Sequence, residues 1–216
     1  MKKIISLTIV YLFITLNTVY GVDNAPLTPE KALQSLMEGN KRYINNQSTH
    51  PNRSEERRNE IASGQSPYAI IVACADSRVA PEIIFDQGLG DLFVVRVAGN
   101  VLGSIEIDSA EYSAIYLNSS VILILGHSNC GAVDAVLKNQ TQDIEAVAAL
   151  IEPAVKKVKK AHEDPSLEKC IKMNALDMKA LIENVPSIKK LINNKKIQVH
   201  AAYYDLNTGR VELLEK

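Results

Sequence analysis

The 216-residue chain has no tryptophan, three phenylalanines and three cysteines. The cysteines, Cys74, Cys130 and Cys170, are far apart and odd in number, and they form no CxxC pair. The sequence therefore offers neither a disulfide framework nor a dithiol redox motif. The chain also has no excess of positive or negative charge, because its 24 lysine and arginine residues are balanced by 25 aspartate and glutamate residues. We expect no nucleic-acid partner and no attraction to an anionic membrane.

A long apolar run lies near the N-terminus. It extends from Ile4 to about Leu16, follows two lysines and is followed by small residues at Val19 and Gly21. This run is shorter than the roughly 20 residues that a spanning helix needs. We therefore expect residues 1–21 to be a secretory signal peptide, with export to the periplasm and no stable membrane association after cleavage. An uncleaved signal anchor is the alternative.

The remaining sequence, residues 22–216, has the pattern of a single α/β domain. Three apolar, β-branched runs (Tyr68–Ala73, Leu92–Val97 and Val121–Leu125) lack polar alternation, which favours strands buried on both faces of a parallel sheet. Helical patterns separate these runs, and strand–helix–strand alternation predicts a layered α/β architecture. The sequence LNTG between two final apolar segments predicts a hairpin, so the last strand should be antiparallel.

Residues 28–46 predict a helical arm ahead of the sheet. Thr28 suits the N-cap position, and Leu33, Leu36 and Met37 recur at helical spacing. Such an apolar stripe needs a surface to cover it. We therefore expect at least a homodimer.

Soft metal ligands follow two of the predicted strands. Cys74 comes directly after the first apolar run, and His127 and Cys130 follow the third. Ligands of open α/β sheets bind at the carboxyl ends of the strands, and two thiolates with one imidazole select zinc. The sequence predicts one Zn²⁺ per chain. Cys170 lies in a helical apolar pattern, where a small buried side chain is expected.

Three protein ligands leave a fourth zinc position open, which is typical of a catalytic site. Asp76 and Arg78 are the ionisable groups beside Cys74. Asp76 can accept a hydrogen bond from water at the open position while Arg78 orients the carboxylate. Alternatively, Asp76 is itself the fourth ligand. A non-catalytic zinc-binding protein is the competing class, although zinc storage needs no such pair.

The stretches CADSRV and HSNCGA, with EGNKRY, GQSP, GDLFVVRVAGN and AYYDLNTGRV, resemble the β-class carbonic anhydrases from about Ala32 to Leu213. The resemblance implies zinc-dependent, reversible hydration of carbon dioxide to bicarbonate and a proton. It implies strand order 2-1-3-4 with the last strand at an edge, and a homodimer or tetramer whose arm packs on a neighbouring subunit. Hydrolysis of CS2 or COS on the same fold is an alternative.

The resemblance also assigns roles to individual residues. The zinc ligands are Cys74, His127 and Cys130, and the catalytic dyad is Asp76 and Arg78. Substrate contacts are expected from Gln65, which reaches across a dimer interface, from Phe93, Ala98 and Tyr112, which line the CO2 pocket, and from Gly131. Some bacterial members use a tryptophan in a second, inhibitory bicarbonate site, and this chain has none.

Overall fold

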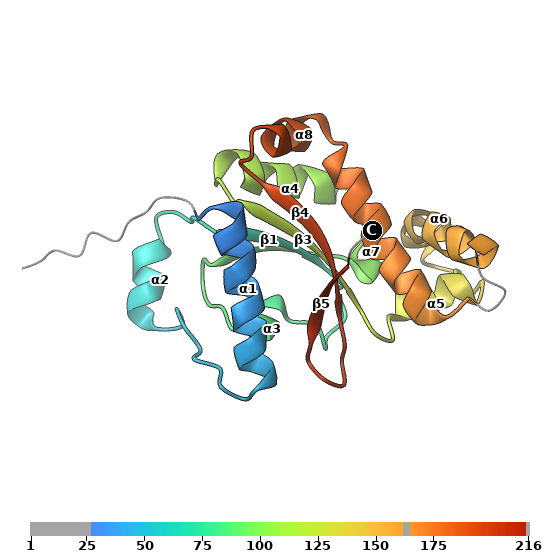
Figure 1. Cartoon of the computed structure of the whole chain (residues 1–216), viewed down its shortest axis with the longest axis horizontal. Coiled ribbons are helices and arrows are strands. Elements are labelled where there is room, and N and C mark those ends of the chain that lie inside the picture. The colour runs from blue at the N-terminus through green and yellow to red at the C-terminus, as the bar shows by residue number, and fades with distance from the viewer. Residues whose placement is uncertain (1–26, 162–164, 215–216) are drawn as a thin grey trace, which may run out of the picture.

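The computed structural model describes residues 27–161 and 165–214, which form a five-stranded sheet with helices on both faces (Figure 1). The strand order is β2-β1-β3-β4-β5, with β5 antiparallel to β4 and the other pairs parallel. This confirms the predicted order and the antiparallel edge strand. The expected signal peptide lies outside the described residues. The strands are β1 (Ala69–Ala73), β2 (Leu92–Arg96), β3 (Val121–His127), β4 (Gln198–Tyr204) and β5 (Val211–Leu214).

The helices form two layers around this sheet. Residues of α1 and α3 share one buried cluster with one sheet face, and residues of α4 to α8 share a second cluster with the other. Within the described ranges, no helix is long and apolar enough to cross a bilayer. The helices are α1 (Pro29–Ile44), α2 (Glu55–Ile61), α3 (Pro81–Ile84), α4 (Ser104–Tyr116), α5 (Gly131–Leu137), α6 (Glu145–Ala161), α7 (Leu167–Glu183) and α8 (Pro186–Asn193), with a 3-10 turn η1 (Ala98–Asn100) after β2.

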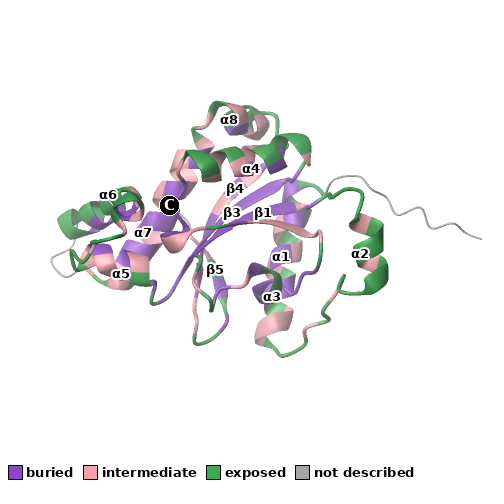
Figure 2. Ribbon diagram, turned by 180° about the vertical axis from the view of Figure 1, so that it is seen from behind, coloured by how far each residue is buried: buried purple, intermediate pink, exposed green. Residues whose placement is uncertain are grey.

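Burial on both faces explains the continuous apolar runs of the central strands. Every residue of β1 and of β3 is buried, as Figure 2 shows for the middle of the sheet. Successive side chains alternate between the layers, so that Ile70 and Val72 join the cluster with α7 while Ile71 joins the cluster with α1. A polar residue on either face would lack water, which is why the strands show no polar alternation.

The helical arm packs on its own sheet. Leu36 is completely buried in the cluster with β1 and β3, and Leu33 and Met37 pack against the same cluster. Thr28 caps the helix as predicted, with its Oγ1 accepting a hydrogen bond from Lys31 N at 3.4 Å. The stripe is thus covered in large part within one chain, so the stripe by itself does not require a neighbouring subunit.

A buried carboxylate joins α1 to the end of α3. The Asp86 side chain is fully buried, and its Oδ2 lies 2.6 Å from Arg42 Nε. It also accepts hydrogen bonds from Thr49 N at 2.9 Å, from Thr49 Oγ1 at 3.1 Å and from His50 N at 3.0 Å. Burial raises the pKa of Asp86, but these donors together outweigh it and hold the pKa well below its usual range. The ionised carboxylate thus anchors α1 and the chain that follows it.

We predict that Asp86→Asn destabilises the fold by about 2–4 kcal/mol at pH 7, because the amide leaves Arg42 and two backbone N–H groups without their charged acceptor. Since the folded-state pKa is depressed, the carboxylate stabilises the fold above the unfolded-state pKa of about 4, and this contribution is lost as pH falls below that value. Urea unfolding of both proteins between pH 7 and pH 3 measures this. Asp86→Asn should show the flatter dependence of stability on pH.

The control is Glu152→Gln, which breaks an exposed surface pair with Lys156 and should change stability by less than about 1 kcal/mol. Equal stability of wild type and Asp86→Asn at pH 7 would contradict the assignment.

Candidate metal centre

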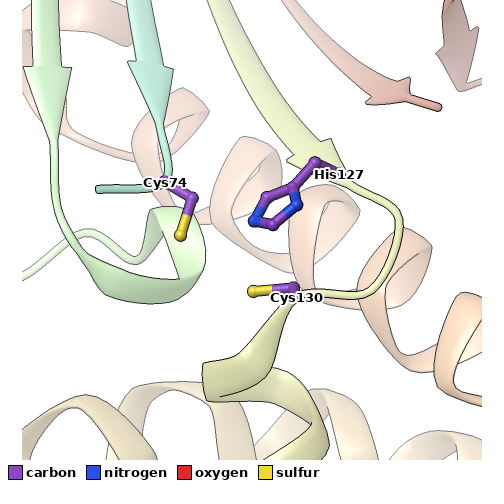
Figure 3. A group of neighbouring side chains, drawn as sticks. All are labelled: Cys74, His127 and Cys130. Carbon is purple, nitrogen blue, oxygen red and sulfur yellow. The ribbon is translucent and has the colours of Figure 1, made fainter. Parts of the chain in front are cut away.

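The three predicted ligands meet at the carboxyl end of the sheet. Cys74 directly follows β1, His127 is the last residue of β3, and Cys130 is the N-cap of α5. Because β1 and β3 are adjacent and parallel, their ends lie side by side. The ligand atoms of the three buried residues all lie within 4.8 Å of one another, and Figure 3 shows the side chains pointing toward a common centre.

The turn after β3 orients the His127 ring. Nδ1 lies 2.9 Å from Ser128 O, so Nδ1 carries the proton and donates it to that carbonyl. Ser128 is itself held, since its N–H donates to Tyr204 O at 2.9 Å and its Oγ accepts from Leu206 N at 2.8 Å. His127 Nε2 is buried and has no hydrogen-bond partner among the described residues. This nitrogen is free to bind a metal ion.

Backbone donors and the second thiol surround Cys74. A hydrogen bond from Cys130, opposed in part by burial, lowers the pKa of Cys74, and the same contact raises the pKa of Cys130. The N–H groups of Gly99 and Asp76 also lie 3.2 and 3.4 Å from Cys74 Sγ. Two thiols this close cannot both ionise without a cation between them. The donor set, two cysteine sulfurs and one neutral imidazole nitrogen, therefore fits zinc.

Asp76 and Arg78 form a two-point ion pair beside the ligands. Arg78 Nε and Nη2 donate to Asp76 Oδ1 and Oδ2 at 2.9 and 2.7 Å, and the Arg78 N–H donates to Oδ1 at 2.9 Å. These hydrogen bonds hold the pKa of Asp76 well below its usual range. Asp76 Oδ2 lies 3.9 Å from His127 Nε2. The Arg78 side chain is 52% exposed and that of Asp76 16%, so the pair stands between solvent and the buried ligands.

The residues expected to contact substrate lie on several different elements of the chain. Phe93 and Tyr112 lie together, with ring centroids 6.3 Å apart. Ala98 begins η1, next to the Gly99 N–H that contacts Cys74. Gly131 is the exposed first residue of α5, with open space where a side chain would stand.

Gln65 is exposed in the loop before β1, whereas Cys74 follows β1. The whole of the strand, about 16 Å at 3.3 Å per residue, separates these two positions. Within one chain, Gln65 is therefore not part of the metal centre.

Two residues that were not predicted as site residues, Arg96 and Gly99, hold the loop that follows β1 and carries Cys74 and Asp76. Arg96 Nε donates to Cys74 O at 3.2 Å, and its Nη2 donates to Asp76 O at 2.7 Å. Gly99 adopts a positive φ of 69° and presents its N–H to Cys74 Sγ. The sequence carried a signal for Arg96, because the last residues of neighbouring parallel strands lie together and Arg96 pairs with Ala73.

Comparisons with known proteins agree with this geometry. A family model described as "Carbonic anhydrase" matches residues 69–211. A relative named "Carbonic anhydrase 2" from Mycobacterium tuberculosis is 52% identical over 109 residues, which cover 50% of this chain and 53% of the relative. The chain thus spans about half the length of that relative. A relative named "Carbonic anhydrase" from Pseudomonas aeruginosa is 31% identical over 72% of this chain and 76% of its own length.

The fold is also that of a solved enzyme. The structure titled "The structure of the beta-carbonic anhydrase CcaA" matches with a TM-score of 0.68 and 25% identity, over 85% of this chain and 95% of that one. The family match runs from β1 to the first residue of β5, and it includes Cys74, His127 and Cys130. Because sequence, fold and ligand cluster agree, the chain belongs to the β-class carbonic anhydrase family.

Proposed function

We propose that this chain is a zinc-dependent carbonic anhydrase that reversibly hydrates carbon dioxide to bicarbonate and a proton. The observation that carries the proposal is the buried Cys74–His127–Cys130 cluster with the ionised Asp76–Arg78 pair beside it. Membership of the family indicates which reaction to expect, and the cluster supplies the metal ligands that this reaction needs. Zinc, when bound, would act as a Lewis acid that lowers the pKa of water, so that hydroxide would be available as the nucleophile near neutral pH.

The protein's own residues provide orientation. Asp76 is a fixed hydrogen-bond acceptor, because Arg78 holds both carboxylate oxygens and the depressed pKa keeps the group ionised. An acceptor in this position orients the reacting water and receives its hydrogen bond. Arg78 is held in turn by Asn129 O, to which its Nη2 donates at 3.3 Å. The ion pair is therefore positioned by two loops, the one after β1 and the one after β3.

The carbon dioxide site is proposed to include Phe93, Ala98, Tyr112 and Gly131. An apolar surface suits a small uncharged substrate, and the Phe93–Tyr112 ring pair on β2 and α4 supplies one. Gln65 is proposed to contact substrate from a second copy of the chain, because its own β1 separates it from the metal centre.

We also propose that the chain self-associates through β2 and an exposed surface of α4, which we call the α4 patch (Ile105, Tyr112 and Tyr116). These three side chains are 75%, 48% and 71% exposed, and the Tyr112 and Tyr116 rings lie 5.6 Å apart. Beside them β2 is a sheet edge, and none of the described segments pairs with its outer side. Large exposed apolar groups next to an open strand edge are typical of an interface between copies.

Export is a further proposal, and it is supported by residues 1–21. The two lysines, the apolar run and the small residues at its end are the features of a cleaved signal peptide. We propose that the mature domain acts in the periplasm.

We predict that Cys130→Ala loses bound zinc, because one of three protein ligands is removed. Metal analysis of the purified protein, together with a carbon dioxide hydration assay, measures the effect. Cys170→Ala is the matched control, since Cys170 is a buried cysteine of α7 outside the cluster, and it should keep about one zinc per chain. Full zinc content in Cys130→Ala would remove Cys130 from the ligand set.

Asp76→Asn is expected to keep its zinc and to lower carbon dioxide hydration about 10- to 100-fold. The amide keeps the shape of the side chain, but it loses the charge that pairs with Arg78 and one of the two acceptor oxygens. Zinc content and hydration rate should be measured side by side. Asp134→Asn, a carboxylate on α5 paired with Lys138, is the control and should hydrate at the wild-type rate. Wild-type turnover in Asp76→Asn would reject its catalytic role, whereas complete zinc loss would make Asp76 an obligatory ligand.

Tyr116→Glu is expected to weaken self-association. A buried aromatic at an interface contributes about 2 kcal/mol, which corresponds to a roughly 30-fold rise in the dissociation constant. Sedimentation velocity over a concentration series measures this change. Ala149→Glu places the same charge at an exposed position on α6, away from both β2 and the α4 patch, and should leave the assembly intact. An unchanged mass for Tyr116→Glu would contradict the proposed interface.

A further inference from the structure

Helix α7 holds the chain segment that follows β2 at two points. Asn174 Nδ2 donates to Gly99 O at 2.8 Å. One helical turn later, Met178 Sδ accepts a hydrogen bond from Leu102 N at 3.2 Å. Residues four apart on a helix share one face, so this face of α7 fixes residues 99–102 as a unit.

Gly99 connects this anchor to the metal centre. Its N–H lies 3.2 Å from Cys74 Sγ, while its carbonyl is the group that Asn174 holds. Gly99 has a positive φ of 69°, and a Cβ built on it would lie 2.7 Å from Ile151 Cδ1. Glycine is thus favoured here, and glycine is also the residue with the most backbone freedom. A contact that immobilises its carbonyl removes that freedom and keeps the N–H directed at the sulfur.

Asn174 differs chemically from its neighbours on α7. It is completely buried, and its Oδ1 has no hydrogen-bond partner in the described part of the chain. An unpaired buried acceptor destabilises a fold, so a position that served packing alone would favour an aliphatic side chain. The amide is explained by its donor, which reaches Gly99. The other buried residues of α7 are apolar: Cys170, Ile171, Ala175, Met178 and Ile182.

The same helix contacts the strand that carries the histidine ligand. A Cβ built on Gly126, the residue before His127, would lie 3.1 Å from Ile171 Cγ2 and 3.5 Å from Ala175 Cβ. Asn174 stands between these two side chains in sequence. The buried face of α7 therefore supports both the donor to Cys74 and the end of β3.

We propose that Asn174 is a positioning residue of the metal centre: by holding the Gly99 carbonyl it keeps the Gly99 N–H on the Cys74 thiolate. An N–H donor stabilises a thiolate and sets how much charge the sulfur gives to a bound metal. Asn174 acts through Gly99, because its side chain donates its hydrogen bond to Gly99 O and, among the described residues, makes none to a ligand atom. This inference rests on the proposed zinc-dependent function.

The test compares the cobalt-loaded full-length mature proteins of wild type, Asn174→Leu and Ile182→Ala. Leucine has the same branched arrangement of side-chain heavy atoms as asparagine, with more bulk, but it cannot donate a hydrogen bond, so the Gly99 N–H loses its fixed direction. Two readouts are independent of turnover: the sulfur-to-cobalt charge-transfer absorption, and the rate at which a chelator extracts the metal. Ile182→Ala destabilises the same helix two turns away by opening a cavity, without removing a polar contact.

For Asn174→Leu we expect the charge-transfer band to move to longer wavelength and metal extraction to become about tenfold faster. Ile182→Ala should unfold at a lower temperature but keep the wild-type spectrum and the wild-type rate of metal extraction.

A folded Asn174→Leu with the wild-type spectrum and extraction rate overturns the proposal. An equal change of both readouts in Ile182→Ala also overturns it. If Asn174→Leu does not fold, Asn174→Ala, which removes the same donor without adding bulk, is measured instead. A wild-type protein without a thiolate charge-transfer band would contradict the zinc site itself, so the two failures are distinguishable.

Discussion

The register between β1 and β3 determines where every group of the metal centre lies. Ala73 stands opposite Leu125, so the residues that follow these positions, Cys74 and the Gly126–His127 end of β3, emerge side by side. A shift by one residue would turn the side chains of a strand to the opposite face. That shift is prevented because both faces of the two strands are packed with side chains of different layers. The apolar core therefore supports the site by fixing a register.

Burial of the three ligands then favours the binding of a cation between them. Cys74, His127 and Cys130 are all buried, and a thiolate in such a place is stable only with opposing charge or hydrogen-bond donors. The donors come from elements that are distant in sequence. Gly99 and Asp76 donate to Cys74 Sγ, and the Ser128 carbonyl orients His127. The Asp76–Arg78 pair beside them reaches toward solvent, so a fixed carboxylate stands on the solvent side of the buried ligands.

Family resemblance and structure contributed different parts of this picture. The antiparallel edge and the three candidate ligands were predictable from local signals, which are apolar runs, a hairpin turn, an HxxC spacing and a cysteine at a strand end. The strand order was expected from the family resemblance. The helical arm was predicted from its Thr28 cap and its stripe, but the surface that the stripe covers was not. Periodicity shows that Leu36 needs a partner; it does not show that the partner is the chain's own sheet.

The sequence by itself determined the ligand types and their positions at strand ends, because strand and turn propensities act between neighbouring residues. Tertiary structure alone decided which distant groups support those ligands. Arg96 reaches the carbonyls of Cys74 and Asp76, and Asn174 holds Gly99 from 75 residues away. No spacing rule marks the contact between Asn174 and Gly99, since it depends on how α7 packs across the sheet. The depressed pKa of Asp76 likewise requires the folded position of the Arg78 side chain, because hydrogen-bond geometry exists only once the loop has closed on itself.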